Sequence, residues 1–69
     1  MKKYLASYYG FSPYTGKHEV SIYKDMYNGS YSVYCDDEYW ATFDALKDFE
    51  DEVVFIEIAY KVKINFFGF

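Results

Sequence analysis

Two stretches of the chain alternate apolar positions with polar or aromatic ones at a period of two, the pattern of a strand with one buried face. The first lies within residues 19–26, and its apolar positions are Val20, Ile22 and Met26. The second is residues 53–67, where Glu57, Lys61, Lys63 and Asn65 fall on one face and apolar residues fall on the other: Val54, Ile56, Ile58, Tyr60, Val62, Ile64 and Phe66. We predict a β-strand over each stretch, the second being the last element of the fold.

The segment before these stretches predicts another strand and a loop. Residues 2–9, KKYLASYY, have the aromatic content of a strand, although their alternation is weak. Residues 10–17, GFSPYTGK, contain two glycines and the only proline, so we assign them to a loop.

Asn28-Gly29 predicts a tight hairpin between the strand at residues 19–26 and a following strand that ends at Cys35. This dipeptide suits the two left-handed positions of a type I′ turn. With these two residues as the loop, Tyr23 faces Tyr34 and Ile22 faces Cys35. That register gathers the apolar side chains on one side of the sheet, and a slip of one residue would invert both strands. Cys35 is then a small buried residue of the core.

Residues 36–52 combine a capping signal with a helical period. Asp36 or Asp37 can accept hydrogen bonds from the free amides of a first helical turn. At about 100° per residue, one face carries Tyr39, Phe43 and Leu46, flanked by Trp40 and Phe49. The aspartates fall in a narrow stripe on the opposite side: Asp37, Asp44, Asp48 and Asp51. The pattern predicts an amphipathic helix with an acidic outer face.

The predicted order β-β-β-α-β indicates an α+β fold, a small antiparallel β-sheet with one amphipathic helix packed on one face. At 69 residues the chain should form a single domain, residues 1–69. A chain this short can build only a small core. Its ten Tyr, seven Phe and one Trp supply large side chains for that core.

Catalytic and cofactor chemistry finds little support in the residues. The single cysteine excludes an internal disulfide, and no Cys/His set is available to hold zinc. Gly16-Lys17 precedes His18, where a phosphate-binding loop requires Ser or Thr. We therefore expect no enzyme activity, no cofactor and no metal. No apolar run approaches the roughly 20 residues of a membrane span, so we expect a cytoplasmic protein without a membrane partner.

The acidic residues are concentrated in one part of the chain. Residues 36–52 hold eight of the eleven, opposed there only by Lys47: Asp36, Asp37, Glu38, Asp44, Asp48, Glu50, Asp51 and Glu52. A surface of one sign of charge bears on binding partners and not on the fold. On a helix, Asp44 and Asp48 would lie about 6 Å apart along the axis, similar to neighbouring phosphates of a nucleic acid. Three of the acids would also sit at the helix C-terminus, where the helix dipole disfavours them: Glu50, Asp51 and Glu52.

These charges predict binding of another protein through a basic, nucleic-acid-binding surface, by Asp37, Asp44, Asp48, Asp51 and Glu52. The alternative interpretation is a solvated face that keeps the protein soluble.

Tyrosines mark a second candidate surface, on the side of the predicted sheet away from the helix: Tyr23, Tyr27 and Tyr34. Exposed tyrosine provides contact area with little entropy to lose, and ordinary cross-strand packing is the alternative. We predict a contact face for a partner or for a homodimer. Direct nucleic-acid binding would need a basic track, which seven lysines and a net charge of −4 do not supply.

Short length, a dense acidic segment and abundant tyrosine form a combination similar to small phage-encoded inhibitors of host defence, including anti-CRISPR proteins and nucleic-acid mimics. No family motif matches residue by residue, so no functional position is carried over. The resemblance implies a small inhibitor that occupies another protein's surface. The alternative is a structural or regulatory homo-oligomer assembled through the tyrosine-rich face or the final strand.

Overall fold

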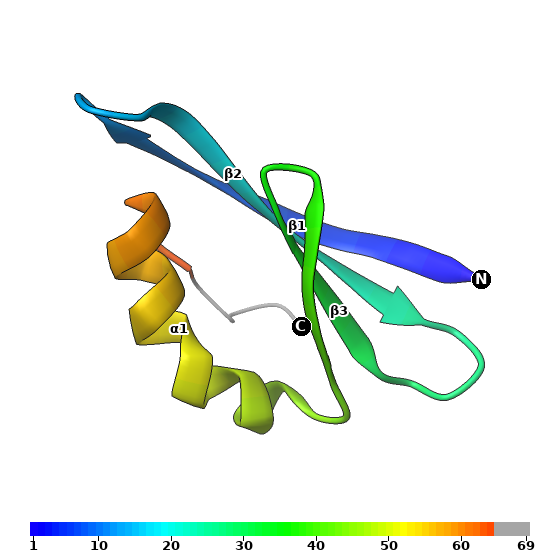
Figure 1. The fold of residues 1–69 in the computed structure, drawn as a ribbon. Helices are drawn as coiled ribbons and strands as arrows, with labels where there is room; N and C mark the ends of the chain where they lie inside the picture. Colours follow the sequence, from blue (N-terminus) through cyan, green and yellow to red (C-terminus); the bar gives the residue numbers. More distant parts are fainter. Residues whose placement is uncertain (65–69) are drawn as a thin grey trace.

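The computed structural model describes residues 1–64 and has four strands followed by one helix (Figure 1). The elements are β1 (Lys2–Ser12), β2 (Gly16–Asp25), β3 (Tyr31–Cys35), β4 (Glu38–Phe43) and α1 (Leu46–Tyr60). The predicted α+β class, with an antiparallel sheet and one helix, is confirmed. The order of elements is β-β-β-β-α, which differs from the predicted β-β-β-α-β.

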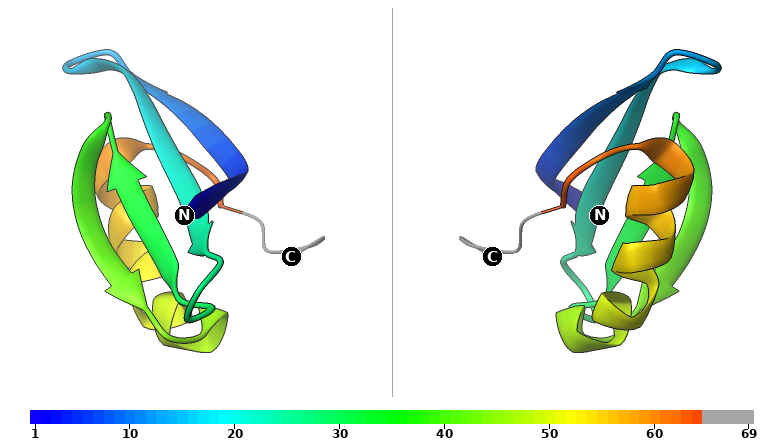
Figure 2. Two further views of the ribbon diagram at one scale, coloured as in Figure 1. Left: turned by 90° about the vertical axis from the view of Figure 1, so that its right-hand side faces the viewer. Right: turned by 90° about the vertical axis from the view of Figure 1, so that its left-hand side faces the viewer.

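The sheet is an antiparallel meander with the strand order β1-β2-β3-β4. It is strongly twisted, and α1 lies against one of its faces (Figure 2). The core forms between that face and the helix. Its buried residues come from β2 and β3, from α1, and from the segment after it: Val20, Ile22, Val33, Cys35, Phe49, Val53, Ile56, Val62 and Ile64. Each large apolar side chain buried in this way contributes about 1.5–3 kcal/mol.

The helix predicted from residue 36 or 37 onwards is wrong in its first part. Asp36 and Asp37 both adopt left-handed backbone angles, with φ of 52° and 66°, and Cys35 pairs with Glu38. The two aspartates therefore form a two-residue turn of the kind expected for a type I′ hairpin, and they do not cap a helix. The chain continues as β4, whose register shift places Trp40 against the core.

The final strand predicted at residues 53–67 is also wrong. Residues 46–60 are helical, and Phe49, Val53 and Ile56 are buried at helical spacing. An apolar run this dense satisfies both periods, so the period of two does not exclude a helix. After α1, Val62 forms one bridge to Gly10. The predicted positions 65–67 lie outside the described residues.

The β2–β3 hairpin keeps its predicted faces but not its predicted turn. Ile22 pairs with Val33 and Val20 with Cys35, two residues away from the predicted register. A shift of two preserves which side chains face the core. The connection is longer than two residues because the Asp25 carboxylate accepts hydrogen bonds from the amides of Tyr27 (2.8 Å) and Asn28 (3.4 Å).

The predicted loop at residues 10–17 is mostly strand. β1 continues to Ser12 and β2 begins at Gly16, so only residues 13–15 connect the two. Among residues 1–64, no helix is long and apolar enough to cross a membrane.

Candidate functional site

A row of four tyrosines crosses the sheet face opposite α1, with one residue from each strand. The rings of Tyr4, Tyr23, Tyr34 and Tyr39 meet edge to face, at successive centroid distances of 5.6, 5.4 and 5.7 Å. We call this surface the tyrosine face. Strand alternation places Tyr23 and Tyr34 there, as predicted, but diagonally and not directly opposite each other. Tyr27 lies outside the row, in the β2–β3 connection, and is 90% exposed.

Sequence reasoning missed the two ends of the row, Tyr4 and Tyr39. Each lies next to a register shift, between Tyr4 and Ala6 in β1 and opposite Val33/Tyr34 in β4. A register shift interrupts the alternation that sequence reading relies on. The sequence also predicts a helix over residues 38–43, so it does not predict β4, the strand that carries Tyr39.

Hydroxyl groups hold the outer rings in place. The Tyr4 hydroxyl donates to Ser7 Oγ at 2.8 Å, and Ser7 Oγ lies 3.1 Å from Ser21 Oγ. On the other side, the Tyr39 hydroxyl lies 2.8 Å from Thr42 Oγ1. Such bonds, together with the ring contacts, fix a surface whose rings alternate in tilt and do not form a flat platform.

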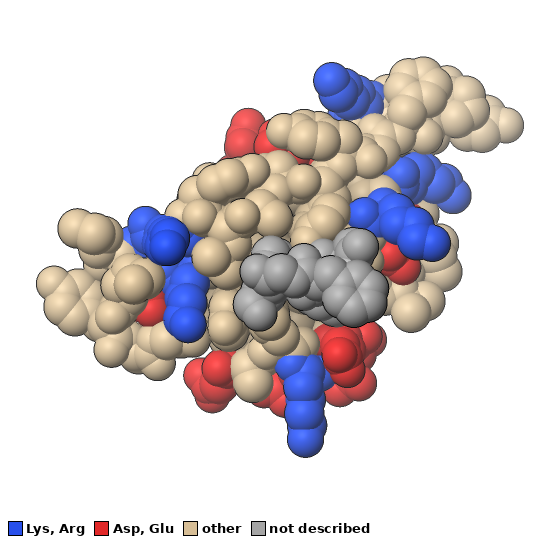
Figure 3. All heavy atoms as spheres, turned by 180° about the vertical axis from the view of Figure 1, so that it is seen from behind, with Lys and Arg blue, Asp and Glu red and all other residues tan. Residues whose placement is uncertain are grey.

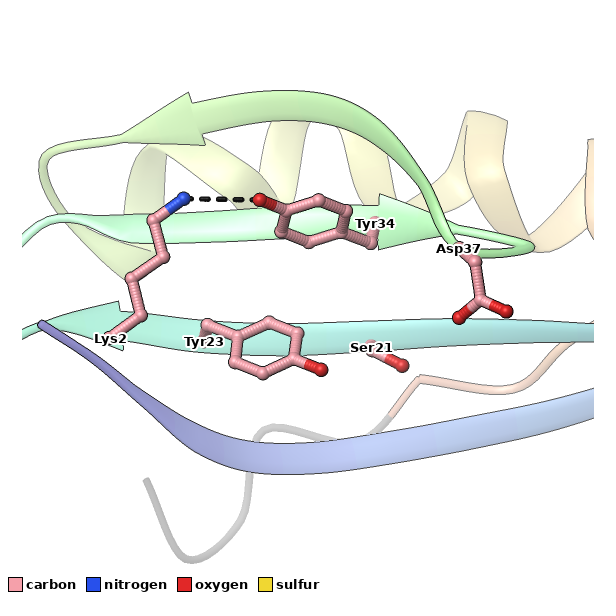
Figure 4. A pocket seen from close by; sticks show the side chains of 5 residues that line it. All are labelled: Lys2, Ser21, Tyr23, Tyr34 and Asp37. Atoms are coloured by element: carbon pink, nitrogen blue, oxygen red, sulfur yellow. Dashed lines mark hydrogen bonds between the residues drawn. The ribbon is translucent and has the colours of Figure 1, made fainter.

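The tyrosine face contains a depression of about 310 Å³ lined by Lys2, Ser21, Tyr23, Tyr34 and Asp37 (Figure 4). Lys2 Nζ lies 5.4 Å from the centroid of the Tyr34 ring and donates a hydrogen bond to its hydroxyl at 3.1 Å. This hydrogen bond is the main reason why the pKa of Lys2 is raised. The Asp37 carboxylate lies at the other end of the depression, where the β3–β4 turn overhangs the strands.

A second depression, of about 410 Å³, lies beside the turns at one end of the sheet and includes His18 and Asp36. His18 Nδ1 lies 2.7 Å from Asp36 Oδ2, and His18 Nε2 lies 2.6 Å from Thr15 Oγ1. The other Asp36 oxygen accepts the Glu19 amide at 2.9 Å. Partial burial raises the pKa of Asp36, but these hydrogen bonds and the His18 charge outweigh that effect and lower it.

The order hydroxyl, imidazole, carboxylate in this chain of contacts is that of a hydrolase triad. Here, however, its three members come from the β1–β2 turn, from β2 and from the β3–β4 turn, and the His18 ring also packs edge-on against Tyr60, 5.5 Å away. We interpret the group as a link between the two turns and the end of α1. Cys35 is 3% exposed, and desolvation raises the pKa of its thiol to about 11, which leaves it protonated near neutral pH.

The structure does not place the predicted acidic residues in one stripe. Asp37 belongs to the β3–β4 turn and Asp44 to the β4–α1 connection, so only Asp48 and Asp51 share a helix face. Because Asp44 precedes the helix, the helical rise that predicted its spacing from Asp48 does not apply. Glu52 is half-buried and accepts a hydrogen bond from Trp40 Nε1 at 3.2 Å. Because α1 runs from Leu46 to Tyr60, residues 50–52 lie in its N-terminal half and not at its C-terminus, so the expected conflict with the helix dipole is absent.

The outer face of α1 has an acidic half and an apolar half. At about 100° per residue, Asp48 and Asp51 precede Val54, Phe55 and Ile58 on the side away from the core. These three apolar side chains are 62%, 61% and 64% exposed. We call this surface the outer α1 face. The strand predicted at residues 53–67 places Val54 and Ile58 in the core, so the sequence analysis did not identify the outer α1 face. A signal for this face was present, because the run VVFIEIAY has more apolar residues than one buried stripe of a helix can hold.

The carboxylates of the outer α1 face are exposed and make no ion pair. In the described part of the chain, the one ion pair joins His18 and Asp36. Seen from behind, acidic side chains gather along the margin where α1 begins, around one projecting lysine (Figure 3). Carboxylates that outnumber the neighbouring lysine give this surface a net negative charge, which attracts positively charged partners.

Comparisons with protein-family models, with curated proteins and with solved structures found no match to this chain.

Proposed function

We propose that this protein is a small, non-enzymatic inhibitor that acts in the cytoplasm by docking the outer α1 face on the basic groove of a nucleic-acid-binding protein. In keeping with the resemblance to phage-encoded anti-defence proteins, the target would be a host protein and the cytoplasm that of the host. One observation carries the proposal: unpaired carboxylates at Asp48 and Asp51 adjoin three apolar side chains that are each more than three fifths exposed.

The two halves of this surface serve different steps of binding. Complementary charge speeds encounter and sets orientation, which is the expected role of Asp48 and Asp51, with Asp37 and Asp44 adding to the acidic field. Burial of apolar and aromatic side chains supplies most of the affinity at protein interfaces, which is the expected role of Phe55 and Ile58. Exposed apolar side chains that adjoin on one helix face are typical of interaction sites.

The test begins with capture of a partner from a bacterial lysate, followed by measurements on the purified partner. We expect Phe55→Ser to weaken binding at least tenfold, about 1.4 kcal/mol, and Asp51→Lys to weaken it at low salt more than at high salt. Tyr14→Ser and Glu38→Lys are matched controls, because both residues are exposed and lie outside α1. Nucleic acid should compete for the partner. Binding that is unchanged in both α1 variants would refute the proposal.

A homo-oligomer assembled through the tyrosine face is the second candidate function. Its support is that Tyr4 and Tyr39, on the two edge strands, are 53% and 58% exposed. The route through a final strand is removed, because residues 46–60 form α1. Light scattering separates the candidates: a dimer that persists in high salt supports the oligomer, and a monomer supports the inhibitor.

A further inference from the structure

We propose that the depression on the tyrosine face is a binding site for a primary ammonium group, and that its ligand is a lysine side chain of the basic partner, which takes the place now held by Lys2. This inference rests on the proposed function, and it names what the second contact surface recognises.

The depression already holds an ammonium group. Lys2 Nζ donates a hydrogen bond to the Tyr34 hydroxyl at 3.1 Å and lies 5.4 Å from the centroid of that ring. The ammonium thus contacts the hydroxyl edge of the ring, where the oxygen accepts a hydrogen bond. The contact shows that the geometry of the floor accepts this chemical group.

The charge and the size of the depression suit a lysine side chain. Asp37 places an exposed carboxylate at the far end of the depression, with Ser21 and Tyr23 between it and Lys2 (Figure 4). A lysine that entered from that end would pass the carboxylate and the hydroxyls of Ser21 and Tyr23 before its ammonium reached the Tyr34 hydroxyl. The volume of about 310 Å³ lies at the lower limit of small-ligand sites and suits one side chain.

The tilt of the tyrosine rings favours lysine over arginine and over a nucleic-acid base. The rings of the row meet at interplanar angles of 68°, 82° and 71°, so they alternate in tilt. Guanidinium groups and bases prefer to stack on a flat ring face. A compact ammonium donates in three directions and does not need a flat face.

Lys2 can leave without disturbing the fold. It is the first residue of β1 and its side chain is exposed, and contacts of exposed cations with aromatic rings are weak. An external lysine therefore competes with Lys2 on similar terms. Replacement of Lys2 by alanine should empty the site while the backbone pairing of β1 remains.

The experiment titrates the purified full-length chain with n-butylammonium and follows the tyrosine ring signals by NMR. We expect the rings of Tyr23 and Tyr34 to shift in the Lys2→Ala variant, with an affinity several-fold higher than in the wild-type protein. Adding Tyr34→Leu to Lys2→Ala should reduce the affinity several-fold, adding Asp37→Asn should reduce it by a smaller factor, and Tyr14→Leu should not reduce it. n-Pentanol should produce no such shifts, and n-propylguanidinium should bind more weakly than n-butylammonium.

Some results would overturn the inference. Equal shifts with n-pentanol would show that the depression binds any alkyl chain, and unchanged binding after Lys2→Ala would show that Lys2 does not occupy the site. The Asp37→Asn variant keeps a residue suited to a left-handed turn, so its result stands even if Tyr34→Leu unfolds. If ammonium binding fails while the α1 variants still lose the partner, only this inference falls. If ammonium binds but the α1 variants keep the partner, the proposed function falls instead.

Discussion

Asp36 joins the β3–β4 turn to β2 through one carboxylate. The carboxylate accepts a hydrogen bond from the Glu19 amide at 2.9 Å and lies 2.7 Å from His18 Nδ1. Asp36 itself is one of the two residues of the β3–β4 turn. Both contacts favour the charged form of the Asp36 carboxylate. The contact with His18 does so most when the imidazole ring carries a proton.

These contacts predict that part of the stability depends on pH. The pKa of Asp36 is lower in the folded protein than its ordinary value of 3.8. Its charged form therefore stabilises the fold above pH 3.8, and this contribution is lost as the pH falls through the folded pKa. Because the side chain is 41% exposed, the effect should be below about 1 kcal/mol.

The Asp36→Asn variant tests this expectation, since asparagine also tolerates a left-handed backbone. Urea unfolding should show the variant to be less stable than the wild-type protein at about pH 5.5, with the difference shrinking at about pH 3. A difference that is the same at both values would contradict the assigned pKa shift.

Single residues show how far sequence reading extends. Cys35 in the core and Tyr23 and Tyr34 on the opposite face follow from strand alternation alone, and the structure places them so. The contact of Lys2 with Tyr34 could not be predicted, because the two residues are 32 positions apart in the chain and come together only when β1 joins the sheet.

At the scale of elements, the β3–β4 turn shows why local signals were misread. Aspartate before an apolar stretch is a capping signal for a helix, but aspartate also tolerates the left-handed turn that Asp36 and Asp37 adopt. Residues 38–43 form a strand if pairing with β3 lowers the free energy more than helix formation does. That pairing is a tertiary contact, which the local sequence does not show. The same applies to residues 46–60, whose apolar positions fit both the period of two of a strand and the period of about 3.6 of a helix.

We expect Asp37→Gly to stabilise the fold. The φ of Asp37 is 66°, and glycine adopts that angle without the steric penalty of a Cβ atom. Glycine at the second position of a type I′ turn should raise the free energy of unfolding by about 0.5–1 kcal/mol. Thermal unfolding measures this change. A lowered free energy of unfolding would show that the Asp37 carboxylate contributes more than its backbone angle costs.

At the scale of the whole molecule, the segment after α1 closes the fold against β1. Lys61 turns the chain with a left-handed backbone, Val62 bridges to Gly10, and Val62 and Ile64 are buried. A Cβ atom at Gly10 would overlap the carbonyl group of Lys61, so this closure requires glycine there.

Gly10→Ala should therefore lower the free energy of unfolding by about 1–3 kcal/mol and speed hydrogen exchange at the Val62 amide. Gly29→Ala is the control, because its Cβ would meet open space although its φ of 75° is left-handed. The control should lose some stability without affecting Val62. Unchanged exchange at Val62 in Gly10→Ala would contradict the closure.

Sequence reading gave the α+β class and the polarity of the β2 and β3 faces, because both depend on local alternation. It did not give the outer α1 face, since exposure of Val54, Phe55 and Ile58 depends on which side of the helix meets the sheet. The candidate site is thus a property of packing, although its acidic component is visible in the composition.

The central claim is that the outer α1 face is the binding surface, and the association rate of the purified partner tests it most directly. For the wild-type protein, the rate should fall steeply as salt rises from about 0.05 to 0.5 M. For the Asp48→Lys/Asp51→Lys variant, it should be slower at low salt and converge with the wild-type rate at high salt. Equal rates with equal salt dependence in the two proteins would contradict the claim.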